Sequence, residues 1–445
     1  MYRLPLLRFL LLILMHVERS RKNSASGSAF EIIMWLDSTS MAASIQENQN
    51  TVYDDAELIK GELNKCIRCG SCMSVCPVYS VLKTEPAVAR GKMAVIEAAL
   101  AGNLAFANNT VSKILSNCLL CTSCIQTCTT KVNVDAIMLA SRAALVRKKG
   151  QSWLKRILFR FLGNQKYLEL SMKISSVGCR MFPQENKEAN KDSRMGVLHQ
   201  ISRYRSISRK VALPEPAFIS LRERLESHIP VSEPVAKAGF FTGCSMNFFY
   251  PEIGMDVVEV LSKNHVEISI PKQQGCCGMA VFASGDVESA RMIARKNLDA
   301  VEHADFDYLI FGCGSCCSAW KNYYPELLRS DPVYGFKADC WSKRAYDISS
   351  FLVNIISYRK PKGMIEARVT YHDPCHLKKT LKVSQEPREI IKTIPGVVLR
   401  EMENPDACCG MGGTYCISHY KTSKTIADRK MHDINKTEAD MIVTG

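Results

Sequence analysis

The sequence has 445 residues and a formal net charge of +14, with 47% hydrophobic and 23% charged residues. These proportions are ordinary for a soluble globular protein, and the length allows two or three domains. The unusual feature is the 20 cysteines, which cluster in CxxC patterns. In a long chain without a convincing export signal, such clusters favour metal binding and argue against a disulfide scaffold.

Residues 1–54 are interpreted as an N-terminal extension or a mis-called leader. Their apolar run, Leu4 to Val17, is too short to span a bilayer and is interrupted by Arg8. The run is similar to the hydrophobic region of a signal peptide. However, no twin-arginine pair precedes it, and a chain rich in reduced thiols does not suit export to an oxidising compartment. We therefore expect a cytoplasmic protein, with Met34 or Met41 as alternative starts.

Two cysteine runs follow the extension, and each has the spacing CxxCxxCxxxC. They comprise Cys66, Cys69, Cys72 and Cys76 in the first run, and Cys118, Cys121, Cys124 and Cys128 in the second. In two-cluster ferredoxins, three cysteines of a run bind one 4Fe-4S cluster and the fourth binds the other cluster. The predicted ligand sets are therefore Cys66, Cys69, Cys72 and Cys128 for one cluster, and Cys118, Cys121, Cys124 and Cys76 for the other. Structural zinc is the alternative, but it usually takes two CxxC knuckles per site.

The sequence around these runs is helical in pattern. Apolar residues recur at helical spacing over 89–103 and 134–150, and Gly150 is expected to end the second helix. Residues 55–150 therefore resemble the α-helical ferredoxin domain of the iron-sulfur subunits of succinate dehydrogenase and heterodisulfide reductase types. One departure is Thr129, which stands where the family usually has proline after the fourth cysteine.

Residues 151–235 are expected to form a basic linker with an amphipathic helix. From residue 147 to residue 210 there are sixteen Lys or Arg against four acids. The expected helix has an apolar stripe (Trp153, Leu154, Ile157, Leu158, Phe161 and Leu162) and a basic edge (Lys155, Arg156 and Arg160). We favour a helix packed on the protein's own core or on a partner, and the alternative is peripheral binding to the inner face of the cytoplasmic membrane. No motif supports nucleic-acid binding, and the polar segment 183–194 is expected to be a loop.

The second half of the chain contains one unit used twice. Its first copy (236–360) carries Cys244, Cys276, Cys277, Cys313 and Cys316, and its second copy (361–445) carries Cys375, Cys408 and Cys409. Strand-like segments precede these cysteines and helical segments lie between them. We therefore expect an α/β domain built from two repeats, with the cysteines at the sheet edge. Gly278 and Gly410 allow a tight turn after each cysteine pair.

These spacings match the CCG domain that is shared by heterodisulfide reductase, the glycolate oxidase iron-sulfur subunit, anaerobic glycerol-3-phosphate dehydrogenase and lactate-utilisation proteins. The domain order is most similar to the glycolate oxidase iron-sulfur subunit. The resemblance implies a further iron-sulfur cluster at the five cysteines of the first repeat, while zinc or a redox-inert site is the alternative. His372 and His376 flank Cys375, where they either donate hydrogen bonds to cluster sulfur or serve only the structure.

The sequence shows no dinucleotide fingerprint in a strand-to-helix context and no nucleophile constellation, so we expect no catalytic residues and no substrate site in this chain. The resemblance implies an electron-transfer subunit that accepts electrons from a FAD-linked glycolate or lactate dehydrogenase subunit and passes them toward quinone, at a membrane surface or a quinone-reducing subunit. Alternatives are a heterodisulfide-reductase-like protein with a catalytic CCG cluster, and an electron carrier like the iron-sulfur component of anaerobic glycerol-3-phosphate dehydrogenase.

Alignment of the two copies of the repeat also predicts where the sequence stops. Gly312 precedes Cys313 in the first copy, and Gly445 takes the corresponding place in the second. We therefore expect the sequence to stop one residue before a final CxxC.

Overall fold

In the computed structural model, residues 56–181, 214–302 and 305–445 are described. The N-terminal extension 1–54 and the polar segment 183–194, both named in the sequence analysis, lie outside the described residues.

The described part of the ferredoxin region contains helices and no strand. It consists of α3 (Ala56–Asn64), α4 (Cys72–Val75), α5 (Pro77–Leu82), the 3-10 helix η1 (Glu85–Ala87), α6 (Ala89–Leu100), α7 (Asn109–Ser116), α8 (Ser123–Thr127) and α9 (Val134–Lys149). The longer helices bury their apolar faces in one core, which includes Met93, Ile96 and Ile137. The Asn133 side chain caps the start of α9, and Gly150, at φ +74°, follows its last residue. Both helices expected around the cysteine runs are confirmed.

Two helices of the basic segment follow, and they contact each other as a hairpin. They are α10 (Trp153–Leu162) and α11 (Gln165–Met181). The described residues then resume with the short α13 (Leu221–Arg224), whose first turn has a capping box between Ser220 and Glu223.

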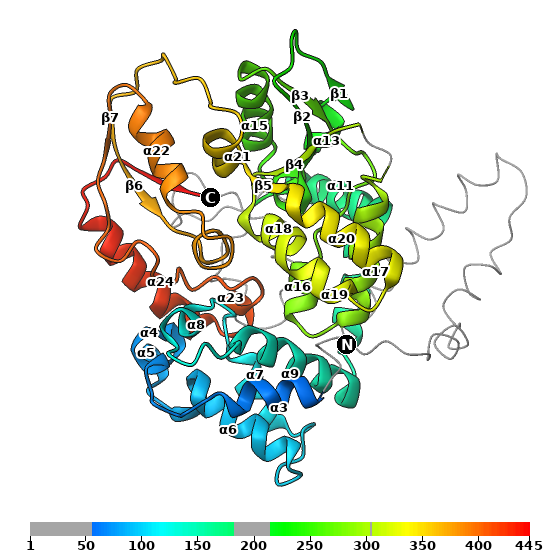
Figure 1. Cartoon of the computed structure of the whole chain (residues 1–445), viewed down its shortest axis with the longest axis vertical. Helices are drawn as coiled ribbons and strands as arrows, with labels where there is room; N and C mark the ends of the chain where they lie inside the picture. Colours follow the sequence, from blue (N-terminus) through cyan, green and yellow to red (C-terminus); the bar gives the residue numbers. More distant parts are fainter. Residues whose placement is uncertain (1–55, 182–213, 303–304) are drawn as a thin grey trace, which may run out of the picture. The chain divides into compact units, whose positions relative to one another are not determined.

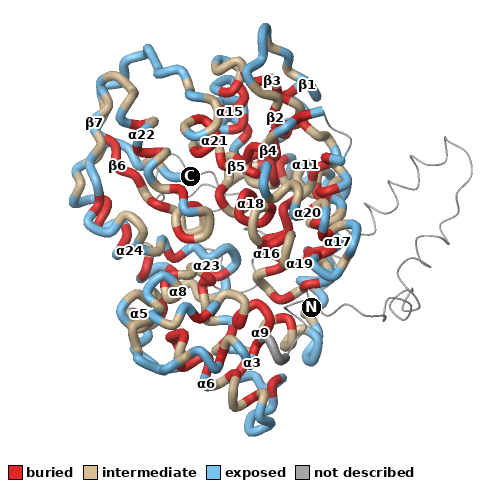
Figure 2. Tube along the Cα trace, in the orientation of Figure 1, coloured by how far each residue is buried: buried red, intermediate tan, exposed pale blue. Residues whose placement is uncertain are grey.

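The first repeat forms a five-stranded sheet in the order β1-β3-β2-β4-β5 (Figure 1). Its strands are β1 (His228–Ile229), β2 (Ala236–Phe241), β3 (Val266–Ser269), β4 (Tyr308–Phe311) and β5 (Ala345–Asp347), and only β1 is antiparallel to its neighbour. The helices are α14 (Gly243–Phe248), α15 (Pro251–Lys263), α16 (Met279–Ala283), α17 (Val287–Asp299), α18 (Gly314–Ser318), α19 (Tyr324–Leu328), α20 (Pro332–Arg344) and α21 (Ile348–Asn354). Figure 2 shows β2 and β4 largely buried, as expected for parallel strands covered by helices.

The second repeat forms a smaller parallel sheet in the order β7-β6-β8. Its elements are β6 (Ala367–His372), α22 (Gln385–Thr393), β7 (Val397–Leu399), α23 (Tyr415–Ser418), α24 (Tyr420–Asn435) and β8 (Met441–Thr444). The order repeats β3-β2-β4 of the first sheet. The register agrees too, because Phe241 pairs with Phe311 in the first sheet and His372 pairs with Thr444 in the second. The duplicated α/β unit expected from the sequence is therefore present.

Several elements were not among those expected from the sequence. They include β5, α20 and α21, which follow the CxxC of the first repeat, and two π-helical turns, η2 (Ala319–Tyr323) and η3 (His376–Thr380). The turn η3 begins directly after Cys375, and η2 begins three residues after Cys316. Single π-turns inside helical segments frequently mark functional sites.

Candidate metal centres

The two ferredoxin cysteine loops have the same unusual backbone. In each run the residue before the second cysteine and the residue after it have positive φ: Arg68 (56°) and Gly70 (88°) in the first, Leu120 (52°) and Thr122 (56°) in the second. A residue with a side chain is strained by roughly 1–2 kcal/mol in this conformation. Such strain persists only where the surroundings impose it. The loops therefore curl tightly around the space that their thiols border.

The first cysteine group collects residues from both runs. Cys72 lies close to Cys66 and to Arg90, and burial raises the pKa of the Cys72 thiol. The sulfur of Cys69 interacts with the Ser71 hydroxyl at 3.3 Å and with the Thr129 side chain, which directly follows Cys128. The backbone N–H of Val132 donates to Cys128 Sγ at 3.4 Å. This arrangement supports the predicted set of Cys66, Cys69, Cys72 and Cys128.

The second cysteine group borders a cavity of about 40 Å³. Its lining includes Cys76, Cys118, Cys121 and Cys124, which are the four predicted ligands of the second cluster. The pKa of Cys124 is raised well above its usual value, first by burial and then by the nearby thiols of the group. Tyr79 N–H donates to Cys76 Sγ at 3.4 Å. Cys76 therefore lies with the second run and not with its own, as the ferredoxin rule predicts.

Three cations that sequence reasoning missed surround this second group. Lys92 lines the cavity and donates to the carbonyl oxygen of Ala87. Arg142 donates to Cys118 O at 2.7 Å, and Lys379 donates to Ser123 Oγ at 2.7 Å. Positive charge at these positions stabilises thiolates and the negative charge of a thiolate-ligated cluster. No local signal predicts Lys379, because it reaches the site from the second repeat, 256 residues from Ser123 in the sequence.

The five predicted cysteines of the first repeat come together at one edge of the sheet. Cys244 and Cys313 directly follow the carboxyl ends of parallel strands β2 and β4, and Cys276 and Cys277 follow β3. Hydrogen bonds connect the thiols of Cys244 to Cys276, Cys276 to Cys277, Cys277 to Cys316, and Cys316 to Cys313. The hydrogen bond from Cys316 lowers the pKa of Cys313 to about 6. The chain therefore presents five adjacent sulfur atoms from three segments.

The cysteine pairs of the two repeats are each followed by a turn of the same backbone conformation. Gly278 N–H donates to Cys276 Sγ, and Gly410 N–H donates to Cys408 Sγ, both at 3.4 Å. The glycines have φ of +78° and +81°. A Cβ on Gly410 would lie 2.5 Å from Ser423 O, so the turn requires glycine, as the sequence indicated.

The second repeat meets the ferredoxin region at its cysteines. Cys121 and Cys408 share a hydrogen bond, which lowers the pKa of Cys121 to about 5 and raises that of Cys408. Cys375 is close to both Cys121 and Cys409, and burial raises its pKa to about 11. Cys409 is exposed. Cys375 and Cys408 therefore lie close to Cys121 of the second ferredoxin group, and Cys409 lies close to Cys375.

The two histidines that flank Cys375 contact other parts of the chain. His372 Nδ1 lies 3.0 Å from Pro405 O, and His376 Nδ1 lies 2.7 Å from Ser315 Oγ in the CxxC loop of the first repeat. Burial lowers the pKa of both rings. His376 thus connects the cysteine loops of the two repeats.

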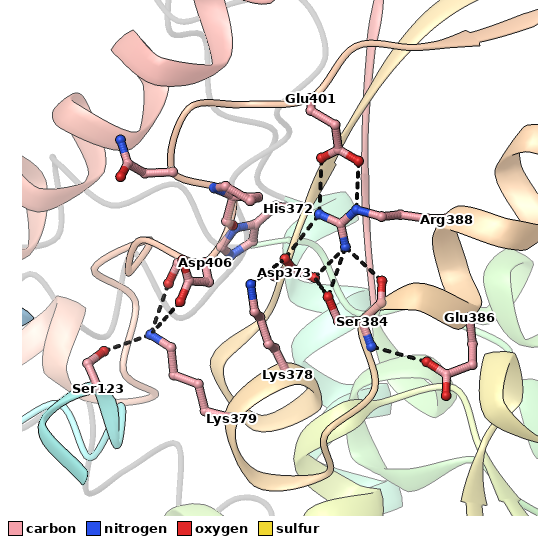
Figure 3. A network of polar contacts seen from close by, with 12 residues as sticks. Ser123, His372, Asp373, Lys378, Lys379, Ser384, Glu386, Arg388, Glu401 and Asp406 are labelled. Atoms are coloured by element: carbon pink, nitrogen blue, oxygen red, sulfur yellow. Dashed lines mark hydrogen bonds and ion pairs between the residues drawn. The ribbon is translucent and has the colours of Figure 1, made fainter. Parts of the chain in front are cut away.

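A buried ion pair fixes the loop that leads to Cys375 (Figure 3). Arg388 donates to both carboxylate oxygens of Asp373, at 2.9 and 3.0 Å, and to both oxygens of Glu401. Burial alone would raise the pKa of Asp373, but its bonds to Arg388 and Lys378 lower it overall. The equivalent position of the first repeat is neutral, because Thr242 N–H donates to Gln274 Oε1 at 2.7 Å there.

Among the described residues, no three His, Cys, Asp or Glu side chains are arranged to bind a single metal ion. Of the cysteines outside the motifs, Cys317 is buried, whereas Cys340 and Cys416 are only partly buried. The side chain of Cys179 lies outside the described residues.

Comparison with known proteins agrees with this division of the chain. Residues 62–132 match the 4Fe-4S dicluster domain family, and residues 238–320 and 369–445 each match the cysteine-rich domain family, CCG. The two matches of one family correspond to the two structural repeats.

One relative matches across both regions, and others match about half of the chain. The probable glycolate oxidase iron-sulfur subunit of Bacillus subtilis (strain 168) is 29% identical over 388 residues, which cover 86% of this chain and 87% of that protein. Lactate utilization protein A 2 of Bacillus cereus (strain Q1) is 31% identical over 207 residues, which cover 46% of this chain and 85% of that protein. The chain belongs to the lactate utilization protein A family, and it is similar to the glycolate oxidase iron-sulfur subunit. Lactate utilization protein A 1 of Bacillus anthracis (strain CDC 684 / NRRL 3495) is also 31% identical over 207 residues.

Membership of the lactate utilization protein A family and similarity to the glycolate oxidase iron-sulfur subunit confirm the resemblance and the fold class inferred from the sequence. The dicluster and cysteine-rich domains identify the chain as an iron-sulfur protein. The assignment of individual cysteines as ligands stays a prediction, which the grouping of the thiols supports. No helix of the described residues is long and apolar enough to cross a membrane.

Proposed function

We propose that this protein is the iron-sulfur electron-transfer subunit of a 2-hydroxy-acid dehydrogenase complex. It would accept electrons from a separate FAD-linked subunit that oxidises glycolate or lactate, and pass them toward quinone on the cytoplasmic side of the membrane. The observation that carries the proposal is the contact between Cys121 and Cys408. It places the thiols of the ferredoxin region and of the second repeat side by side, as electron transfer between neighbouring centres requires.

The residues fit two 4Fe-4S clusters in the ferredoxin region. The donor set is all thiol, the two loops have matching positive-φ backbones, and the second group borders a cavity. Cys66, Cys69, Cys72 and Cys128 would hold one cluster, and Cys76, Cys118, Cys121 and Cys124 the other. The five thiols of the first repeat would hold a third centre. Bound clusters of this kind supply one-electron oxidation and reduction.

The chain itself contributes orientation, charge and exclusion of water. Backbone N–H groups of Tyr79, Val132, Gly278 and Gly410 point at cysteine sulfur and thereby stabilise its anionic form. Lys92, Arg142 and Lys379 add positive charge near the second group, which favours the reduced state of a centre held there. Leu119 and Leu120 are buried beside this group and limit access of water.

The test is anaerobic purification followed by reconstitution. The protein is expected to be brown, to contain about eight irons from the ferredoxin region alone, and to bleach on reduction. When the flavin-containing partner is added, glycolate or lactate should reduce the protein, and the rate of reduction should rise with the concentration of that partner. A colourless protein that contains zinc would refute the electron-transfer function.

Heterodisulfide reduction is the competing outcome. If no 2-hydroxy acid reduces the protein with any flavin partner, while the reduced protein cleaves a disulfide substrate, the catalytic CCG function replaces the one proposed. The glycerol-3-phosphate type of carrier would be identified by reduction with glycerol 3-phosphate and a flavin partner.

A further inference from the structure

The hairpin of α10 and α11 carries an apolar stripe that faces away from the rest of the chain. On α10 the exposed apolar residues are Trp153, Ile157, Leu158 and Phe161, and on α11 they are Tyr167, Leu170, Ile174 and Val177. On α11 these residues are three or four positions apart. On α10 they are also three or four positions apart, except that Leu158 directly follows Ile157. Each set therefore lies on one face of its helix. The rings of Phe161 and Tyr167 are 6.0 Å apart, so the two faces join into one surface, called here the outer stripe.

The opposite face of the hairpin is fixed to the protein. Phe159 is only 4% exposed and Leu168 only 3%. At about 100° per residue, Phe159 lies on the side of α10 opposite to Ile157 and Phe161. Of the apolar stripe expected on α10, Leu162 alone among the described side chains packs against the protein's core, beside Phe159, which lies outside that stripe. Packing of the rest of the stripe on a partner stays a prediction. The outer stripe remains exposed among the described residues.

Polar bonds hold the hairpin in this orientation. Lys296 donates to Gly163 O at 2.8 Å, at the turn between the helices. Gln165 donates to Lys272 O at 2.5 Å, and Glu169 pairs with the buried side chain of Arg222 at 3.2 Å. Lys272 and Lys296 belong to the first repeat, and Arg222 belongs to α13. These hydrogen bonds and this ion pair hold both helices in place, so the outer stripe has a fixed orientation on the protein.

The unpaired charges beside the outer stripe are positive. Lys155, Arg156 and Arg160 are exposed on α10, which contains no acidic residue. On α11, Lys166 is exposed, whereas Glu169 pairs with Arg222 and Lys173 pairs with Glu223. An apolar face with Trp, Tyr and Phe, flanked by Lys and Arg, matches the headgroup region of an anionic bilayer.

We propose that the outer stripe binds the surface of an anionic lipid membrane, with α10 and α11 lying parallel to it. Ten residues of α10 extend about 15 Å, half the thickness of the hydrocarbon core, so the helix can lie in the interface but cannot cross it. The apolar side chains enter the acyl boundary while the cations contact lipid phosphates. This inference does not depend on electron transfer, and it holds for the protein with any redox partner.

The test is co-sedimentation of the full-length protein with vesicles of phosphatidylglycerol and phosphatidylcholine. Wild type is expected to bind these vesicles, to bind pure phosphatidylcholine much more weakly, and to dissociate as salt is raised. Replacing Lys155, Arg156 and Arg160 together by Gln should weaken binding about a hundredfold, since each cation near an anionic surface contributes roughly fivefold. The double variant Leu158→Glu/Leu170→Glu should weaken binding at least as much.

The matched control is Ile253→Glu on α15. Ile253 is 51% exposed, like Leu158 at 51% and Leu170 at 50%, but lies outside the hairpin. It should leave vesicle binding unchanged. Residues 1–55 are present in every variant, so a difference between variants reports on the outer stripe alone. Circular dichroism and iron content confirm that each variant is folded.

Two results would overturn the proposal. One is wild-type protein that stays in solution with anionic vesicles. The other is a Leu158→Glu/Leu170→Glu variant that binds vesicles like wild type but no longer binds the flavin-containing partner, which would identify the outer stripe as a protein interface.

Discussion

The phenol of Tyr323 donates a 2.7 Å hydrogen bond to Oδ2 of Asp135. Tyr323 is the last residue of η2, which follows the CxxC of the first repeat, and Asp135 lies in the first turn of α9 and lines the cavity of the second cysteine group. The bond therefore connects the ferredoxin region to the first repeat. The other oxygen of this carboxyl group, Oδ1, is buried without a hydrogen-bond partner among the described residues.

Asp135 predicts a specific dependence of stability on pH. Burial raises its pKa from 3.8 to about 6, against the smaller lowering effects of Tyr323 and Arg142. A carboxyl whose pKa is higher in the folded state loses stability as pH rises from about 4 through 6, by on the order of 3 kcal/mol in total. Asp135→Asn keeps an acceptor for Tyr323 but cannot ionise. Between pH 5 and pH 8, urea unfolding should show wild type losing about 1–2 kcal/mol relative to this variant.

Asp331 provides a control of opposite sign. Its pKa is lowered overall, because hydrogen bonds from the backbone of α20 and from Arg295 outweigh its burial. Its contribution to stability is therefore present above about pH 4 and is lost as pH falls. Asp331→Asn should be less stable than wild type throughout pH 5 to 8, with no gain at the upper end. A pH-independent difference for Asp135→Asn would contradict its raised pKa.

Paired cysteine substitutions distinguish crosswise from local ligation of the ferredoxin clusters. If Cys76 belongs to the second cluster, Cys76→Ser/Cys118→Ser damages only that cluster, whereas Cys66→Ser/Cys76→Ser damages both. Iron analysis should then show loss of about four irons in the first variant and about eight in the second. Local ligation reverses this order. Cys340→Ser, outside both runs, should retain all iron.

Alanine substitutions at Gly410 and Gly102 distinguish two costs of adding a side chain, which are steric overlap with neighbouring atoms and strain of a positive φ. Both have φ of +81°, but a Cβ on Gly410 would lie 2.5 Å from Ser423 O, whereas nothing lies within 4 Å of a Cβ on Gly102. Gly102→Ala should therefore cost only the strain of positive φ, about 1 kcal/mol. Gly410→Ala should cost several times more, because the turn that points its N–H at Cys408 must shift. Equal losses in urea unfolding would contradict this assignment of the turn.

The ion pair of Arg388 and Asp373 predicts an asymmetric mutational response. Their side chains are 9% and 1% exposed, so Arg388→Ala removes the bidentate partner of a buried carboxylate that keeps only Lys378 and Ser384, and should destabilise the fold by about 3 kcal/mol. Glu401→Ala removes a 44% exposed partner of the same arginine and should cost less than about 1 kcal/mol. Adding Asp373→Asn to Arg388→Ala should recover part of the loss. No recovery would mean that packing of Arg388, and not charge, stabilises this loop.

The features that could be predicted from the sequence are those that depend on residues close together in the chain. The spacing of Cys118, Cys121 and Cys124 follows from the size of a cluster, and the strands before Cys244 and Cys375 follow from short apolar runs. Glycine after each cysteine pair follows from the turn. Each of these signals lies within a few residues of the feature that it predicts.

The missed features depend on contacts between distant segments. Lys379 reaches Ser123, and Tyr323 reaches Asp135, only after the domains have packed, so no local pattern marks them. The packing of α10 depends on distant contacts in the same way. An amphipathic helix reveals its apolar face, but only the tertiary structure reveals that Phe159, on the other side, packs against the core together with Leu162.

The two copies of the duplicated unit differ in the contacts that hold the loop before the first cysteine. Thr242 and Asp373 occupy the same place after equivalent strands, yet one is held by a neutral amide and the other by an ion pair. Because the pKa of Asp373 is lowered, its contribution is lost as pH falls, whereas the Thr242 contact is indifferent to acid. Gradual acidification should therefore loosen the second copy before the first. Circular dichroism during acid titration should show this order, and simultaneous unfolding of the two copies would contradict it.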